Sequence, residues 1–164
     1  MKFSILKEPF LEALQKVQNV VEKKNTVHIL SNILLTSSKE KLSLTATDLE
    51  VGINVSLPIG KGQEGKIAVS AKNLVEIVKE LPNKEITISR KENNWIEISC
   101  HKSTFNLVGL SADEFPPLPV FEDKTYLTVN SEMARDMIDK TLFAVSTDET
   151  RYHLNAVFLE TIEN

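Results

Sequence analysis

Three pairs of neighbouring acidic residues have a spacing that could support acid and base chemistry. They are Asp48 with Glu50, Asp113 with Glu114, and Asp148 with Glu149. Glycoside hydrolases place two carboxylates on either side of the scissile bond, so two of these pairs brought together would define a hydrolase. Each pair lies in a predicted turn or connector, where solvated acids are common. The sequence therefore favours a structural role and predicts no catalytic residue, with a carboxylate hydrolase as the alternative.

Histidine and cysteine give no sign of a metal site. His28, His101 and His153 do not lie at metal-ligand spacing with a cysteine or a carboxylate, so neither a metal nor a cofactor is predicted. Cys100 is the single cysteine, which excludes an internal disulfide and indicates a small core residue. Trp95 stands on an alternating segment, and this pattern favours a packing residue over a stacking platform.

Four lysines could contact phosphate. Lys72 and Lys79 are seven residues apart on a predicted helix, so they share its outer face, away from its apolar side. Lys23 and Lys24 are adjacent in a predicted loop and are the better candidates, because side chains in a loop are free to reach a phosphate. Acidic residues interrupt the helix face, so a mixed, solvated surface is the alternative. The formal net charge of -4 means that any nucleic-acid role must depend on local charge or on shape.

The elements that would position these residues repeat along the chain. From Ile67 to Leu81 the apolar period changes from two to about 3.6 residues, which predicts a strand followed directly by an amphipathic helix. The same pattern occurs from Phe3 to Val17 and from Leu127 to Thr141, and the starting positions 3, 67 and 127 differ by 64 and 60. Ser70, and Asn130 or Ser131, are predicted helix caps. Such repeats indicate units that need their neighbours to bury their apolar faces.

Three alternating segments follow each of the first two helices, which predicts antiparallel meanders. They are Ile29 to Thr36, Lys41 to Ala46, Leu49 to Leu57, Glu85 to Ser89, Trp95 to His101 and Thr104 to Leu110. We therefore expect an α+β fold with a first domain at 1–122, composed of repeats 1–60 and 66–122. A connector rich in proline leads to the start of a second domain at 123–164, where a third copy is truncated. In that copy we expect strands at Leu127 to Val129 and Tyr152 to Thr161.

Composition places the chain among soluble globular proteins. Apolar residues make up 41% and charged residues 26% of its 164 residues, which allows a buried core. No apolar run approaches the roughly 20 residues of a membrane span, and the start is too short and too acidic for a secretory signal. We therefore expect a cytoplasmic protein that does not enter a membrane.

Five motifs resemble the bacterial DNA polymerase III beta subunit, the sliding clamp. They are MKF at the start, HILSNILL (28–35), KLSLTATDLE (41–50), SADEFPPLP (111–119) and RYHLNAVFLE (151–160). The resemblance implies a DNA-clamp fold, in which repeated half-domains form a ring with helices lining the hole and sheets outside. It implies a non-enzymatic processivity factor that encircles duplex DNA, works with the replicative polymerase and a clamp loader, and closes as a head-to-tail homodimer. A fragment of this length would be a monomer, and a peptide-binding adaptor is a further alternative.

The resemblance also implies roles for particular residues. Lys24 matches a basic residue that contacts the duplex, whereas Asp148 stands where the family has a polar contact residue, and its charge is a departure. Phe105 and Leu107 match positions that the family buries between subunits. The edge of the pocket that captures partner peptides is matched by Arg151, Tyr152, His153 and Leu154.

Overall fold

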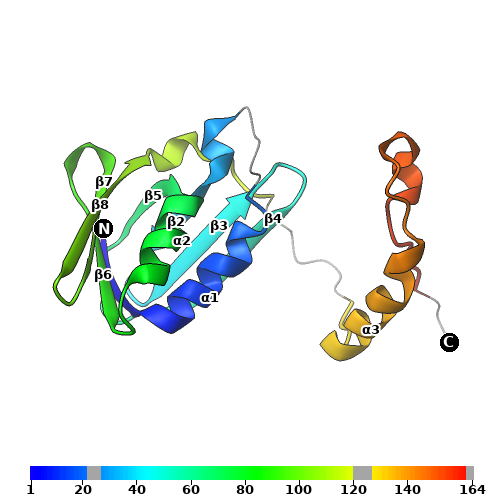
Figure 1. Cartoon of the computed structure of the whole chain (residues 1–164), viewed down its shortest axis with the longest axis horizontal. Helices are drawn as coiled ribbons and strands as arrows, with labels where there is room; N and C mark the ends of the chain where they lie inside the picture. The colour runs from blue at the N-terminus through cyan, green and yellow to red at the C-terminus, as the bar shows by residue number, and fades with distance from the viewer. Residues whose placement is uncertain (22–26, 120–126, 162–164) are drawn as a thin grey trace. The chain divides into compact units, whose positions relative to one another are not determined.

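The computed structural model describes residues 1–21, 27–119 and 127–161. The chain divides into two compact units, Met1–Pro119 and Val120–Asn164 (Figure 1). The strands are β1 (Lys2–Leu6), β2 (Asn32–Ser37), β3 (Lys41–Thr47), β4 (Gly52–Pro58), β5 (Gly65–Ser70), β6 (Glu85–Arg90), β7 (Trp95–Cys100) and β8 (Ser103–Leu110). The α-helices are α1 (Lys7–Gln18), α2 (Ala71–Glu80) and α3 (Ser131–Thr141). Short 3-10 turns are η1 (His28–Ser31), η2 (Glu92–Asn94), η3 (Ala112–Glu114), η4 (Leu142–Ala144) and η5 (Glu149–Leu154).

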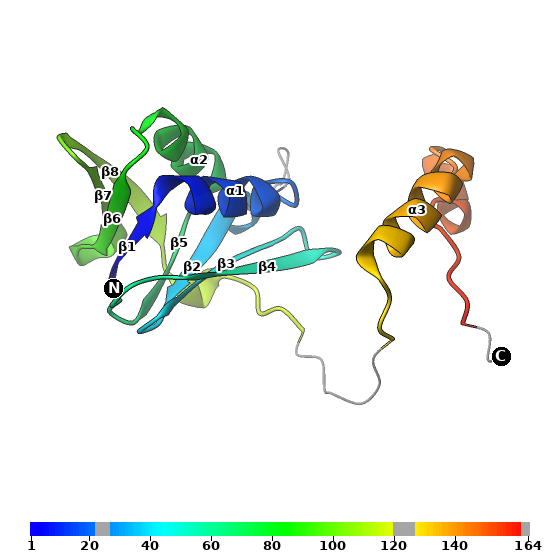
Figure 2. The ribbon, with the colours of Figure 1, turned by 90° about the horizontal axis from the view of Figure 1, so that it is seen from below.

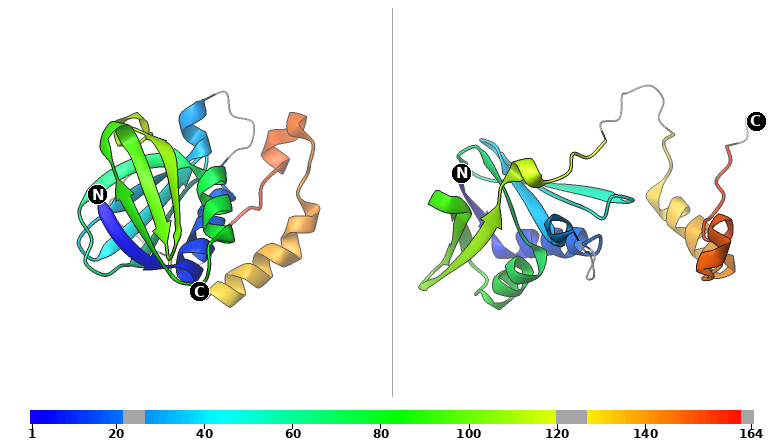
Figure 3. Two further views of the ribbon diagram at one scale, coloured as in Figure 1. Left: turned by 60° about the vertical axis from the view of Figure 1, so that its left-hand side comes forward. Right: turned by 90° about the horizontal axis from the view of Figure 1, so that it is seen from above.

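The strands of the first unit form one antiparallel sheet in the order β1-β6-β7-β8-β5-β2-β3-β4. The first strand of each repeat pairs with the meander of the other repeat. Strand β1 lies beside β6, with Phe3 opposite Ile88, and β5 lies beside β2, with Val69 opposite Ile33. The blue β1 beside the green β6 is visible in the left panel of Figure 3. The two repeats therefore exchange their first strands, and neither has a complete sheet alone.

Helices α1 and α2 contact each other and lie on the same side of the sheet (Figure 2). Their apolar faces are buried against the strands, through Phe10, Ala13, Leu14 and Val17 on α1 and through Ala71, Leu74, Val75 and Val78 on α2. The Phe3 and Phe10 rings meet edge to face, with centroids 6.5 Å apart, so β1 and α1 share one core. The predicted α+β fold, with two strand-helix-three-strand repeats, is confirmed.

Local hydrogen bonds explain where the helices begin and end. The Ser70 hydroxyl accepts a bond from the Asn73 amide at 3.4 Å, which confirms Ser70 as the cap of α2. At the other end of α2, the Lys7 ammonium donates to the carbonyl of Lys79 at 2.8 Å and also to that of Leu81. A cation at a helix C-terminus satisfies free carbonyls and the helix dipole. Lys7 thus joins the start of α1 to the end of α2.

Two strands begin later than the alternation predicts. Strand β2 begins at Asn32, because the Asn32 side chain donates to the carbonyls of His28 and Ile29 and holds η1 as a turn. Strand β4 begins at Gly52, because Asp48 Oδ1 accepts bonds from the amides of Glu50 and Val51 and extends the turn. Residues that bond their own backbone therefore shorten both strands.

The second unit differs from the prediction for a third copy. Helix α3 forms as expected, and Asn130 Oδ1 caps it by accepting bonds from the amides of Glu132 and Met133. The strands expected at Leu127 to Val129 and Tyr152 to Thr161 are wrong, because within residues 127–161 no strand forms and η5 occupies part of the second segment. A strand needs a partner for its backbone groups, and these residues offer none.

Strands β5 and β8 join the two halves of the sheet over only two residue pairs, Ala68 with Leu110 and Val69 with Gly109. A Cβ on Gly109 would lie 2.7 Å from the Ala68 carbonyl oxygen and 2.8 Å from an Ile67 side-chain carbon. These distances are too short for any side chain at position 109. The Ala68 carbonyl belongs to the backbone of β5, which cannot move away without breaking its pairing with β8. Gly109 therefore permits the junction.

We expect Gly109→Val to lower the free energy of unfolding by about 2 kcal/mol or more, as overpacking usually does. Urea unfolding of the chain measures this. Gly60→Val is the matched control, because a Cβ at Gly60 meets nothing within 4 Å. Equal stability of the two variants would show that Gly109 is not required at the junction.

Candidate functional site

The outer face of α2 carries the two predicted lysines. Lys72 and Lys79 are both exposed and point away from the buried side of the helix. Glu76 and Glu80 are exposed beside them, so the face is mixed in charge. Lys23 and Lys24 lie outside the described residues. The two described lysines therefore lie on an exposed surface of mixed charge on the helical side of the sheet.

Phe105 and Leu107 lie on β8 beside an unpaired strand edge. Strand β8 pairs with β7 over Ser103–Val108 and with β5 only at Gly109 and Leu110, so among the described residues of the first unit the other side of Ser103–Val108 has no strand partner. Phe105 is 38% exposed, although Ile98 opposite it is fully buried, and Leu107 is half-buried. Natural proteins usually cover an exposed strand edge that carries a large apolar side chain.

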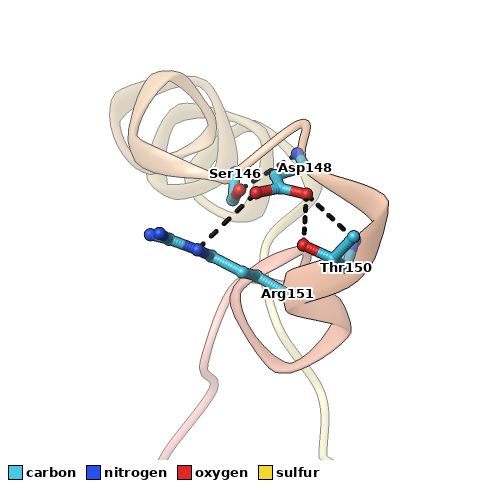
Figure 4. Close-up of polar contacts among 4 residues, drawn as sticks. All are labelled: Ser146, Asp148, Thr150 and Arg151. Atoms are coloured by element: carbon cyan, nitrogen blue, oxygen red, sulfur yellow. Dashed lines mark hydrogen bonds and ion pairs between the residues drawn. The ribbon is translucent and has the colours of Figure 1, made fainter.

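Asp148 organises the turn that contains the remaining predicted residues (Figure 4). Its Oδ1 atom accepts bonds from the Thr150 hydroxyl at 2.6 Å and from the Thr150 amide at 3.0 Å. Its Oδ2 atom lies 3.6 Å from Arg151 Nε, and its own amide donates to the Ser146 hydroxyl. The bonds from Thr150, led by its hydroxyl, hold the pKa of the Asp148 carboxyl below its usual value. The carboxylate thus caps η5.

The turn presents Arg151, Tyr152, His153 and Leu154 together, and all four are exposed. Tyr152 is 81% exposed and meets His153 edge to face, with ring centroids 5.5 Å apart. The Ser146 amide donates to the Leu154 carbonyl, which closes the turn on itself. The closed turn thus exposes one cationic, two aromatic-ring and one aliphatic side chain next to one another.

The acidic pairs have structural partners. The hydrogen bond from the Val51 amide, together with that from the Glu50 amide, holds the pKa of the Asp48 carboxyl below its usual value. Asp48 therefore stabilises the turn before β4 in the same way that Asp148 stabilises η5. Among the described residues, no group of histidine, cysteine, aspartate and glutamate side chains could hold a metal ion. In the same residues, no helix is long and apolar enough to cross a membrane.

Sequence reasoning missed two features. Lys7 holds the end of α2, and only the three-dimensional arrangement shows this, because Lys7 and Lys79 are far apart in the chain. Trp95 is 43% exposed, so the packing role predicted for it is wrong. Its neighbours Ile96 and Ile98 are buried on the opposite face of β7. Strand alternation was the signal that could have placed Trp95 outside.

Comparison with known proteins identifies the family. A family model described as the N-terminal domain of the DNA polymerase III beta subunit matches residues 1–119, and the chain belongs to this family. The chain is 36% identical to the beta sliding clamp of Halalkalibacterium halodurans over 168 residues, which cover 98% of the chain and 44% of that protein.

Solved structures of the family have the same fold. The chain resembles a sliding clamp from Bartonella birtlesii with a TM-score of 0.94 and 32% identity, over 100% of the chain and 44% of that protein. It resembles the polymerase III beta subunit of Caulobacter crescentus with a TM-score of 0.91 and 38% identity, over 99% of the chain and 44% of that protein. The chain thus spans less than half the length of these relatives.

We expect the η5 turn to lose order at low pH. Since the pKa of Asp148 is lowered, its charged form stabilises the turn above the usual aspartate pKa, and this contribution is lost as the pH falls through the lowered value. Hydrogen exchange of the Thr150 amide, followed by NMR, measures it. Asp148→Ala should speed exchange several-fold at neutral pH.

Asp148→Asn is the control, because the amide oxygen still accepts a bond but does not titrate. It should retain protection and remove this pH dependence. Exchange at Thr150 that is the same in all three proteins would contradict the capping role.

Proposed function

We propose that this chain is the first domain and the beginning of the second domain of a bacterial sliding clamp. In its full-length form the clamp would act as a non-enzymatic processivity factor of the replicative DNA polymerase. The observation that carries the proposal is the family match over residues 1–119, together with two helices side by side on one face of a curled sheet. The helical face would line the hole of a ring, and the sheet would form its outside.

A ring of this kind holds DNA by topology. It needs little affinity, so the net charge of -4 is compatible with encircling a polyanion. Lys72 and Lys79 on α2, with Lys23 and Lys24, would supply weak attraction to phosphates in any sequence. For Asp148 we propose an indirect role, because its carboxylate would repel a phosphate but holds residues 146–154 in shape.

The unpaired edge of β8 supports a subunit interface. We propose that Phe105 and Leu107 are buried there when two full-length chains meet head to tail. Such contacts close into a ring only when both complementary surfaces are present, so the 164-residue chain is expected to be a monomer. The exposure of Phe105 in the first unit is what such an interface requires before assembly.

The η5 turn supports partner binding. We propose that Arg151, Tyr152, His153 and Leu154 form one edge of a pocket for peptides of the polymerase and the clamp loader. Their joint exposure on one closed turn favours this assignment. A cytoplasmic location and the absence of a membrane partner belong to the same proposal.

The DNA contacts can be tested in the full-length protein by combining Lys24→Ala, Lys72→Ala and Lys79→Ala. We expect reduced loading onto primed DNA and a weaker dependence on salt, by about 0.9 in the log-log slope for each lost phosphate contact. Lys102→Ala, in the exposed turn between β7 and β8, is the control. Unchanged loading and salt dependence in the triple variant would assign these lysines to the solvated surface alone.

The interface can be tested by sedimentation of full-length Phe105→Ala. Buried aromatic residues dominate interfaces, so we expect the dimer to weaken by at least about tenfold. Val108→Ala is the matched control, because Val108 is 51% exposed on the same strand but points to the other face. A similar loss in both variants, or none in either, would place the interface elsewhere.

A further inference from the structure

The outer face of the sheet, opposite α1 and α2, carries a hollow beside the N-terminus. It has a volume of about 780 Å³ and is lined by Met1, Arg90, Lys91, Glu92 and Trp95. A second hollow of about 480 Å³ shares three of these residues and extends over Lys2, Thr87 and Ser89. None of the residues assigned to DNA, to the subunit interface or to the η5 turn lines either hollow.

Trp95, which lines the larger hollow, belongs to an exposed apolar surface. Trp95 is 43% exposed and lies opposite Val108, which is 51% exposed, so the pair forms an apolar surface on the outer face. Tryptophan with one side open is enriched at binding surfaces, since it offers a large area at low entropy cost. Both side chains are partly open to solvent in the described part of the first unit.

The rim of the hollow is rich in cations. Lys2, Arg90 and Lys91 line the two hollows together with Glu92 and Glu97, and Lys91 pairs with Glu97 at 3.0 Å. Arg90 donates to two neutral acceptors, the Lys66 carbonyl at 3.0 Å and Asn94 Oδ1 at 2.7 Å. These bonds leave its positive charge without a carboxylate partner among the described residues. A local cationic excess thus occurs in a chain of net charge -4.

The hollow is held in shape by backbone bonds. The Arg90 amide donates to the Met1 carbonyl at 2.9 Å, and the Lys91 amide donates to the Trp95 carbonyl at 2.7 Å. Asn93 and Asn94 close the turn with φ values of 54° and 60°, which asparagine tolerates well. A ligand would therefore meet a preformed surface and lose less entropy on binding.

We propose that this hollow binds an acidic, extended peptide that carries one large apolar side chain. The apolar side chain would pack on Trp95 and Met1, and the carboxylates would face Lys2 and Arg90. The Ser89 hydroxyl can bond a peptide backbone, and the Thr87 hydroxyl, which already shares a bond of 2.9 Å with the Ser4 hydroxyl, can accept one further bond. Single-stranded nucleic acid fits less well, because one aromatic ring gives no series of stacking platforms and Glu92 would repel phosphates.

Trp95 reports on its own site, because it is the only tryptophan of the sequence. The probe is an acetylated and amidated pentapeptide with leucine between two pairs of aspartates, titrated into the 164-residue chain. We expect a saturable change in Trp95 emission. The change should disappear when alanine replaces the leucine or when lysines replace the aspartates.

Charge reversal gives the second arm of the experiment. Lys2→Glu should weaken binding of the pentapeptide by about fivefold, whereas Lys102→Glu, at the far end of β7, should not change it. The proposal is overturned by the absence of saturation or by equal binding of the lysine peptide. Tighter binding of a five-residue oligothymidine would also overturn it, as would emission that depends on protein concentration without peptide, which would indicate a second copy.

Discussion

The exchange of first strands between the two repeats is the interaction on which the first unit depends. Strand β1 completes the meander of the second repeat, and β5 completes that of the first. Because α1 follows β1 and α2 follows β5 without a loop, the exchange also brings both helices to one face of the sheet. Phe3 and Val69 then enter one shared core. Strand pairing between the repeats therefore produces both the face that carries the two helices and the continuous sheet on the other side.

Helix starts and helix caps could be predicted from the sequence, because both depend on residues that are close together in the chain. The change of period at Ser70 predicts both the start of α2 and its cap, and Asn130 does the same for α3. The starts of β2 and β4 were missed because Asn32 and Asp48 bond their own backbone, and alternation of apolar residues does not record such bonds.

The pairing partners could not be predicted in the same way. Any of the alternating segments could pair with any other, and nothing in the period of β1 says that it joins β6. In the second unit, strands were predicted where none forms. An alternating segment such as Leu127 to Val129 does not form a strand without a pairing partner. For the site, sequence placed Lys72 and Lys79 on an exposed face, but only contacts show that Lys7 holds α2 and that Asp148 caps η5.

The long separation in sequence between β1 and its partner β6 has a consequence for synthesis. Because Phe3 pairs opposite Ile88, β1 leaves the ribosome long before β6 and has no strand partner until most of the domain has emerged. Its pairing closes a long loop late in folding, and contacts between distant residues slow folding. During that interval Phe3 and Ile5 would stay open to other chains, and the adjoining α1 is the first element able to shield them.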